Sequence, residues 1–530
     1  MNADLSSAVC GKSIIRVAAT ACLVSCCLVL LDLWNNRDLF DPEGITYLDM
    51  ADAYLRGEWR AALIGLWSPL YPSLLALVML FFAPSGQWEF TTVHGVNLLI
   101  YLIELATFSV FLLEFLRAIK QIPARLQLPA WSWLVLGYSL FTWSVIRLTP
   151  VHLPEPDSIV CSLVYLIFAL LFRIRTEAVT WGKWILFGVV LGLGYLTKAV
   201  IFPMAFVFTG VALILAWGSA KKLYKILVAF SVFLLLSLPY ILALSSANAR
   251  WTFSDAGWLN YAWEIEQVKK WNHWQGEETV YGTPVHPTRK INDNPPMYEF
   301  ATPFQVTYAP WYNPSYWYDG VKITIDSRRQ LSVIIRNIIA LLFFLATSPG
   351  SAATGVRTWY GLQYATDRTV GALLTLLCVI VLTKLGDVSI FRGITEHWFV
   401  LVPIGTVMGL YSLLHFEGRY IAAYVVILWM VLFRSIAIPY LLESKRIFTA
   451  VLVAAAIVVA MTLAAQTGQA ALHAAQYFTN SKNDAPFLQS GYTNWKVANY
   501  LQTTGLREGE PVGSVGWTFS AYWARMLEFT

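Results

Sequence analysis

Four short segments of the chain combine acidic, basic and hydroxyl side chains in ways that could support chemistry. The first runs from Asp41 to Asp52 and holds four carboxylates within twelve residues. A helix that begins near Pro42 would place Glu43 and Tyr47 one turn apart on the same face. A carboxylate there could act as a general base. An acidic helix start that complements the helix dipole predicts the same residues, so the local pattern leaves both interpretations open.

The second segment, Thr149 to Asp157, is rich in proline and carries His152, Glu155 and Asp157 just before an apolar run. Asp157 is well placed to cap the helix that follows. The three side chains are also of the types that bind a divalent metal, although their spacing matches no specific metal motif. The cofactor therefore stays unknown, with a divalent metal as the one candidate.

The third and fourth segments place single cations at the ends of apolar runs. Lys198 lies between two such runs and has no carboxylate within ten residues on either side. A lysine in this position needs a partner distant in sequence, a bound anion or water, unless it reaches the membrane surface along its own stem. Arg419 and Tyr420 follow His415 and Glu417, and Glu417 could simply neutralise Arg419. We expect Lys198 and Arg419 to converge on one anionic group, such as a phosphate.

The elements that must position these side chains are transmembrane helices. Of the 530 residues, 57% are hydrophobic and only 13% are charged, which is too little charge to cover a soluble surface. Runs near the length needed to cross a bilayer recur along the chain. They are expected at residues 14–33, 93–116, 131–148, 158–172, 185–197, 200–217, 226–244, 331–347, 369–385, 397–414, 419–436 and 446–465.

The net charge of +5 and the six cysteines exclude other classes of protein. The charge is modest for this length and gives no reason to expect a nucleic-acid partner. The cysteines lie in or beside the apolar runs, without the spacing of a disulfide framework or a zinc site. The first run, 14–33, has no small-residue cleavage site and is expected to be an uncleaved anchor.

The basic loops set the orientation, because cytoplasmic loops carry an excess of Lys and Arg. This rule places the N-terminus in the cytoplasm and makes the segments 34–90, 149–157 and 245–330 external. Residues 69–84 are then expected to form an interfacial or re-entrant helix and not a span. The rule also requires residues 467–530 to be external, so one of the twelve expected spans must be miscounted, most simply between 348 and 396. The cytoplasmic basic residues are Arg117, Lys120, Arg125, Arg173, Arg175, Lys183, Lys221, Lys222, Lys225, Lys445 and Arg446.

The predicted fold is an all-α polytopic membrane protein with about eleven to thirteen transmembrane helices. Residues 1–466 form the membrane domain. Residues 467–530 form a small or truncated external α/β segment, with a helix near 495–501 and a strand near 512–517. The loop 245–330 is rich in proline and aromatic residues, which favours an irregular packed loop over a helix. We expect it to lie over the mouth of a cavity and to bind sugar through Trp258, Tyr261, Trp271, Trp274, Trp311 and Trp317.

Taken in order over residues 1–440, these segments resemble motifs of the GT-C glycosyltransferases. Within them, the chain is similar to the bacterial protein-mannosyltransferase-like or aminoarabinose-transferase-like family. In that family, Glu43 would be the catalytic carboxylate because it keeps the spacing to Tyr47; Asp41 stays as the alternative, since Pro42 splits the acidic pair. Glu155 and Asp157 likewise stay undecided. The matching residues are Asp41-Pro42-Glu43, Tyr47, Ala51, Pro69-Leu70-Tyr71-Pro72, Thr149–Asp157, Gly192–Lys198 and Arg419-Tyr420.

The resemblance implies an inverting enzyme that moves a sugar from a polyprenyl-phosphate donor to a hydroxyl of a glycan, lipid or protein acceptor. The implied location is the bacterial inner membrane, with the active site facing the periplasm or exterior. Lys198 and Arg419 would bind the donor phosphate. Substrate would contact Tyr47, His152, Glu155, Asp157 and Tyr420.

Two other classes of protein have to be weighed against this one. A transporter or flippase for a lipid-linked or anionic substrate would also have about a dozen spans. Transporters usually show internal repeats and charges near the bilayer midplane, whereas this sequence has no detectable repeat and carries its charges at span ends. A membrane scaffold without catalytic activity would not explain the carboxylates that gather beside the spans.

Overall fold

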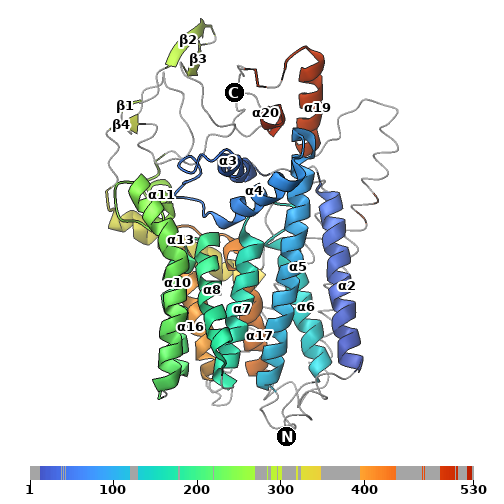
Figure 1. Ribbon diagram of the computed structural model, residues 1–530, viewed down its shortest axis with the longest axis vertical. Coiled ribbons are helices and arrows are strands. Elements are labelled where there is room, and N and C mark those ends of the chain that lie inside the picture. Colours follow the sequence, from blue (N-terminus) through green and yellow to red (C-terminus); the bar gives the residue numbers. More distant parts are fainter. Residues whose placement is uncertain are drawn as a thin grey trace.

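The computed structural model is a helical bundle that carries shorter elements at one of its ends (Figure 1). Almost every described element is a helix, as predicted from the sequence. The structure describes residues 12–37, 39, 41, 43–119, 129–176, 179–218, 220–268, 283–284, 288–294, 296–300, 318–319, 324–347, 394–436, 468, 471, 490–507, 509–510 and 522–527.

The long helices of the bundle match the apolar runs of the sequence. Among the described residues, five helices are long and apolar enough to cross a membrane, which makes the chain an integral membrane protein. The expected spans 369–385 and 446–465 lie outside the described residues. Nine described helices, these spans and shorter or less apolar ones together, form the bundle: α2 (Lys12–Asn35), α5 (Gly86–Ile119), α6 (Ala130–Arg147), α7 (Asp157–Thr176), α8 (Trp181–Thr197), α9 (Ile201–Leu215), α10 (Ala220–Ala247), α16 (Trp398–Leu413) and α17 (Ala422–Ile436).

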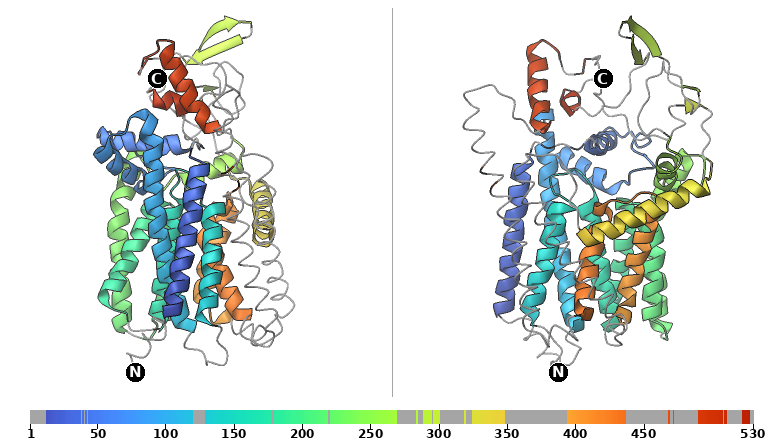
Figure 2. Two further views of the ribbon diagram at one scale, coloured as in Figure 1. Left: turned by 90° about the vertical axis from the view of Figure 1, so that its right-hand side faces the viewer. Right: turned by 180° about the vertical axis from the view of Figure 1, so that it is seen from behind.

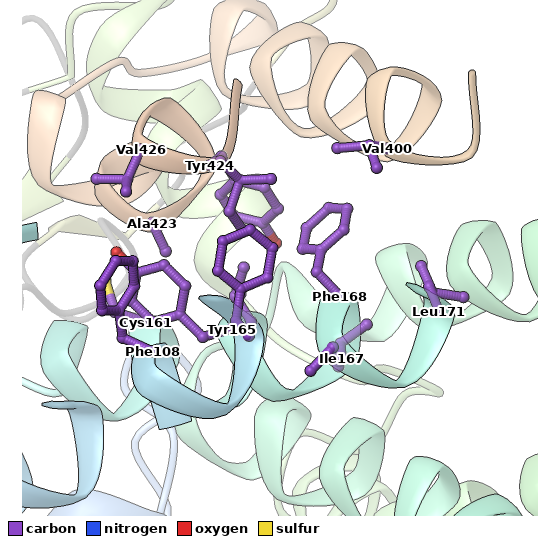
Figure 3. Close-up of a cluster of buried hydrophobic side chains, with 14 of the residues drawn as sticks. Phe108, Cys161, Tyr165, Ile167, Phe168, Leu171, Val400, Ala423, Tyr424 and Val426 are labelled. Carbon is purple, nitrogen blue, oxygen red and sulfur yellow. The ribbon is translucent and has the colours of Figure 1, made fainter. Parts of the chain in front are cut away.

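Aromatic side chains fill the centre of the bundle, where α5, α7 and α17 meet (Figure 3). The Phe108 ring lies 5.1 Å from the Tyr165 ring, and the Phe168 ring lies 6.2 Å from the Tyr424 ring, both edge to face. Small residues allow closer contacts elsewhere: a Cβ on Gly188 of α8 would lie 2.1 Å from the carbonyl oxygen of Ala229 in α10. Close packing of this kind is typical of helices in membranes.

The shorter elements gather at one end of the bundle, which is the upper end in Figure 1. We call it the site end. The α2 helix begins at the opposite end, whereas α19 and α20 lie at the site end (Figure 2). The elements at the site end are α3 (Glu43–Leu55), α4 (Leu70–Phe82), α11 (Ala256–Glu264), α19 (Ser490–Thr503) and α20 (Tyr522–Met526), with the antiparallel strand pairs β1 (Thr283–Pro284) with β4 (Tyr318–Asp319) and β2 (Thr288–Asp293) with β3 (Pro296–Phe300).

Two helices, α4 and α13, bear on the topology expected from the sequence. The α4 helix covers most of the expected interfacial segment 69–84 and lies across the end of the bundle in Figure 1. At the expected span 331–347 the structure has α13 (Ser327–Thr347), which runs obliquely across the outside of the bundle (Figure 2), so a span at this position stays a prediction. Arg328, Arg329 and Arg336 give this helix a polar side, which favours an interfacial position.

Two further expectations concern the segments outside the bundle. The prediction that 245–330 contains no helix is wrong, because α11 forms there; its single short stretch is too brief to show a helical period. The expected helix at 495–501 lies within α19. The expected strand at 512–517 lies outside the described residues.

Candidate active site

A cavity of about 590 Å³ opens at the site end, between α3, α11 and the ends of α7, α8 and α16. It brings together seven of the side chains singled out from the sequence, from positions as far apart as Glu43 and Tyr420. Within the described residues, its wall contains more acidic than basic groups: Glu43, Glu155, Asp157 and Glu417 against Lys198 and Arg419. The seven expected residues are Glu43, Tyr47, Glu155, Asp157, Lys198, Arg419 and Tyr420.

Glu43 and Asp41 have different surroundings. Glu43 is the first residue of α3 and its side chain lines the cavity. Asp41 does not line it; its Oδ1 accepts a hydrogen bond of 3.0 Å from the backbone N–H of Glu43. An acidic side chain that accepts a free N–H at a helix start stabilises the helix. The sequence left open a general base or an acidic helix start for this segment. Glu43 is placed to act as the base, and Asp41 stabilises the helix start.

The α3 helix meets the 149–157 loop through Gly44. A Cβ at this position would lie 2.2 Å from Cγ of Pro154, so only glycine permits this contact. The contact brings Glu155 toward the first turn of α3. Farther along the helix, the Tyr47 ring packs edge to face on Trp67 and Tyr71, with centroid distances of 6.1 and 5.2 Å.

Arg419 is surrounded by three carboxylates that come from three parts of the chain. It lies in a 3₁₀ turn, η2 (Gly418–Ile421), just before α17. Its Nε donates to Glu417 at 2.5 Å, its Nη1 donates to Glu155, and its Nη2 lies 3.4 Å from Oε2 of Glu43. One guanidinium thus links Glu43 to the 149–157 loop.

Of the partners that the sequence left open for Lys198, the structure shows a residue distant in sequence. Its Nζ donates to Oδ1 of Asp157 at 2.5 Å, across 41 residues of sequence. The same Nζ lies 3.9 Å from the centroid of the Tyr420 ring, and Cζ of Arg419 lies 5.4 Å from that centroid. The Tyr420 ring is stacked on Tyr411 at 4.8 Å. Lys198 and Arg419 therefore converge on one aromatic ring, which stabilises both charges through cation–π contacts.

Burial changes the proton affinity of two groups in the cavity. Desolvation raises the pKa of Glu43 above its usual value, although the nearby Arg419 guanidinium partly opposes this. Burial alone would lower the pKa of Lys198, but the Asp157 carboxylate, together with the nearby Tyr420 and Glu417, more than offsets this, so the pKa of Lys198 is raised. Glu43 is thus a stronger base than an exposed glutamate, and Lys198 stays charged at neutral pH.

His152 does not line the cavity. It is buried, its Nδ1 donates to Oδ2 of Asp32 at 2.8 Å, and its carbonyl accepts a hydrogen bond from His94 Nε2 at 3.0 Å. Its position therefore gives no support to substrate contact. The metal site considered for this loop is not formed either, because Glu155 binds Arg419 and Asp157 binds Lys198. No group of three or more candidate ligands for a metal occurs among the described residues.

Aromatic rings form much of the remaining wall. Trp258 lies in the wall as expected, from α11, and Trp263 of the same helix joins it. Tyr261 instead accepts a hydrogen bond of 2.9 Å from the backbone N–H of Asp326. The other tryptophans named in this loop, Trp271, Trp274, Trp311 and Trp317, lie outside the described residues. Sequence reasoning missed the wall residues Trp67 and Tyr411, which carry no local signal because each sits in an ordinary apolar stretch.

Comparison with solved structures finds crystal structures of ArnT from Cupriavidus metallidurans. The apo form aligns with a TM-score of 0.43 and 11% identity, over 96% of this chain and 84% of ArnT. The form bound to undecaprenyl phosphate aligns with a TM-score of 0.34 and 10% identity over the same shares. ArnT is a GT-C aminoarabinose transferase, the family that the sequence motifs resemble. No protein-family model and no curated protein matches the chain.

Proposed function

We propose that the protein is an inverting glycosyltransferase that moves a sugar from a polyprenyl-phosphate donor to an acceptor hydroxyl. The observation that carries this proposal is the cavity at the site end, where a partly buried carboxylate with a raised pKa, Glu43, lies beside the convergent cations Lys198 and Arg419. A base and a cationic phosphate site side by side are what such a transfer requires.

Glu43 is the general base of the proposed reaction. It takes the proton from the acceptor hydroxyl while the hydroxyl oxygen attacks C1 of the sugar. The bond between C1 and the phosphate oxygen breaks, and its electron pair leaves with the lipid phosphate. Attack from the face opposite the leaving group inverts the configuration at C1. A raised pKa suits this role, since a stronger base is a better proton acceptor.

Lys198 and Arg419 stabilise the charge that develops on the leaving phosphate. Arg419 can present two N–H groups to phosphate oxygens, whereas Lys198 acts as a point charge. Their carboxylate partners keep both cations oriented toward the cavity. Fixed charges of this kind lower the barrier most when they are in place before the reaction begins.

The location of the cavity suits an amphiphilic donor. The cavity lies at the end of the bundle, so a polyprenyl chain can lie along the apolar helices while its phosphosugar reaches the charged wall. With the N-terminus in the cytoplasm, as the basic loops predict, the site end faces the periplasm or exterior. The tryptophans of α11 offer flat apolar faces for the C–H surfaces of a sugar.

The proposal is tested with purified protein in proteoliposomes and a panel of radiolabelled polyprenyl-phosphate sugars. We expect release of polyprenyl phosphate together with an inverted glycosidic linkage, and loss of both in Glu43→Gln. A flippase would move intact donor across the bilayer without releasing polyprenyl phosphate. Donor that stays intact with every sugar and acceptor tested would contradict the proposal.

A further inference from the structure

A second group of charged side chains lies on α3, outside the cavity wall. Arg525 of α20 donates from Nη1 to Asp49 at 2.5 Å and from Nη2 to Asp52 at 2.6 Å. It also donates from Nη2 and Nε to the two carboxylate oxygens of Glu89 in α5, at 2.6 and 3.0 Å. The Tyr522 hydroxyl donates to the same Glu89 at 2.9 Å. We call Arg525, Asp49, Asp52 and Glu89 the C-terminal clamp.

The clamp holds the side of α3 that faces away from the cavity. Glu43 and Tyr47 are four residues apart and line the cavity. At ~100° per residue, Asp52 lies roughly opposite Glu43 on the helix. The α3 helix therefore has its catalytic face on the cavity and its opposite face on Arg525, so a rotation or shift of the helix at the clamp moves the Glu43 carboxylate.

The contact between Arg525 and α3 depends on the balance of charge around the guanidinium. The Arg525 side chain is only 8% exposed and faces three carboxylates. Without the guanidinium, three acids would lie close together with little water, and their repulsion would push α3 away from α5. Arg525 thus links α3 to α5 at this point.

The segment that carries Arg525 is itself anchored to α5. The Gln87 side chain donates to Asn499 of α19 at 3.1 Å, and the indole N–H of Trp495 donates to the carbonyl of Gln87 at 3.2 Å. The Phe90 ring of α5 contacts both Trp495 and Tyr522. Arg525 therefore belongs to a segment that packs on α5, and this packing fixes the position of its guanidinium relative to the bundle.

We propose that Arg525 is a positioning residue that sets the placement of α3, and through it the alignment of Glu43 with the acceptor hydroxyl. The expected effect on kcat rests on the proposed function. The placement of α3 by Arg525 is a structural claim that can be tested without it. Arg525 does not line the cavity. It acts on the reaction only through α3, whereas Asp157 at the start of α7 and Lys198 just after the end of α8 stay in place. Losing Arg525 should consequently lower kcat and leave the KM for donor nearly unchanged.

The test uses the full-length protein in nanodiscs and compares Arg525→Ala, Arg525→Lys and Arg507→Ala. Arg507 is an exposed arginine of the same C-terminal segment and is the matched control. We expect Arg525→Ala to speed amide hydrogen exchange in residues 43–55 but not in α7 or α8. We expect kcat to fall about tenfold to a hundredfold, the scale of an ångström-sized misplacement. Arg525→Lys should restore part of both properties, and Arg507→Ala should change neither.

Hydrogen exchange separates failure of this inference from failure of the proposed function. If wild-type protein transfers no sugar but Arg525→Ala still loosens residues 43–55, the positioning role stands and the proposed function fails. Unchanged exchange in residues 43–55 of a folded Arg525→Ala protein overturns the positioning role, whatever happens to kcat. If Arg525→Ala does not fold, Asp52→Asn takes its place, because it leaves the bonds to Asp49 and Glu89; unchanged exchange in that variant overturns the inference equally.

Discussion

Two arginines, Arg419 and Arg525, each bind three carboxylates, and each trio includes residues of α3. Arg419 reaches the first turn of α3 from the cavity, whereas Arg525 reaches its later turns from the C-terminal segment. The two sets of side chains have nearly the same chemistry. They differ in which face of one helix they touch.

Access to the cavity separates the two clusters. The side chains of Glu43 and Glu417 are 28% and 37% exposed and line a space of about 590 Å³, whereas Arg525 is 8% exposed and lies outside that lining. A substrate can therefore compete for the partners of Arg419, but the bonds of Arg525 are satisfied within the protein. Charge composition alone therefore does not distinguish a cluster that can react with substrate from a cluster that stabilises the fold. Access to the cavity distinguishes the two.

The largest expected effect is on the base. Glu43→Gln should lower turnover by ~10²–10⁴-fold, the usual loss when a positioned base is removed, with donor affinity largely retained. Single-turnover kinetics and donor binding would be measured side by side. Asp41→Asn is the matched control and should keep most of the turnover, because its carboxylate accepts a backbone N–H. The reverse pattern would assign the base to Asp41.

Next in size is the stability of the clamp. Arg525→Ala should lower the free energy of unfolding by ~3–5 kcal/mol, as expected when one partner of a buried ion pair is removed. Thermal unfolding of the full-length protein in detergent measures this. Adding Glu89→Gln to Arg525→Ala should recover part of the loss by removing one of the repelling charges. A melting temperature unchanged by Arg525→Ala would show that the clamp contributes nothing to stability.

The two cations of the cavity should show a smaller and coupled effect on donor binding. Lys198→Ala and Arg419→Ala should each weaken donor affinity by roughly tenfold to a hundredfold, since a hydrogen bond to a charged group contributes ~1.5–3 kcal/mol. The double variant should lose less than the sum if both cations bind one phosphate. Isothermal titration with a polyprenyl phosphate measures all three losses. Strictly additive losses would indicate two separate anion sites.

The smallest expected effect is a shift in pH dependence. Glu43 must be deprotonated to act as a base, so kcat/KM should fall as the pH drops through its raised pKa, at a higher pH than for an ordinary glutamate. Arg419 holds this pKa down, so Arg419→Gln should move the acidic limb to still higher pH. A pH profile of kcat/KM for both proteins measures the shift. A limb that moves toward lower pH in Arg419→Gln would contradict this assignment of the base.

The sequence by itself determined the membrane architecture and the main inventory of the cavity. The apolar runs predicted the long helices that the structure describes in the bundle, because a helix satisfies its own backbone hydrogen bonds in lipid. The isolation of Lys198 in an apolar stretch showed that its partner had to be a residue distant in sequence, a bound anion or water, unless the side chain reached the membrane surface. The short spacing from Glu43 to Tyr47 likewise placed both on one face of a helix. These are local properties, and the residues that determine them are neighbours in the chain.

Only the tertiary structure decided which side chains share the cavity and which serve the fold. It showed that Asp41 binds the start of α3, that His152 binds Asp32, and that Arg525 binds Asp49 across 476 residues. A single arginine in an aromatic stretch has no signature in sequence. Its role depends on contacts between residues far apart in the chain, and those contacts are set by how the helices pack and not by the pattern of any one helix.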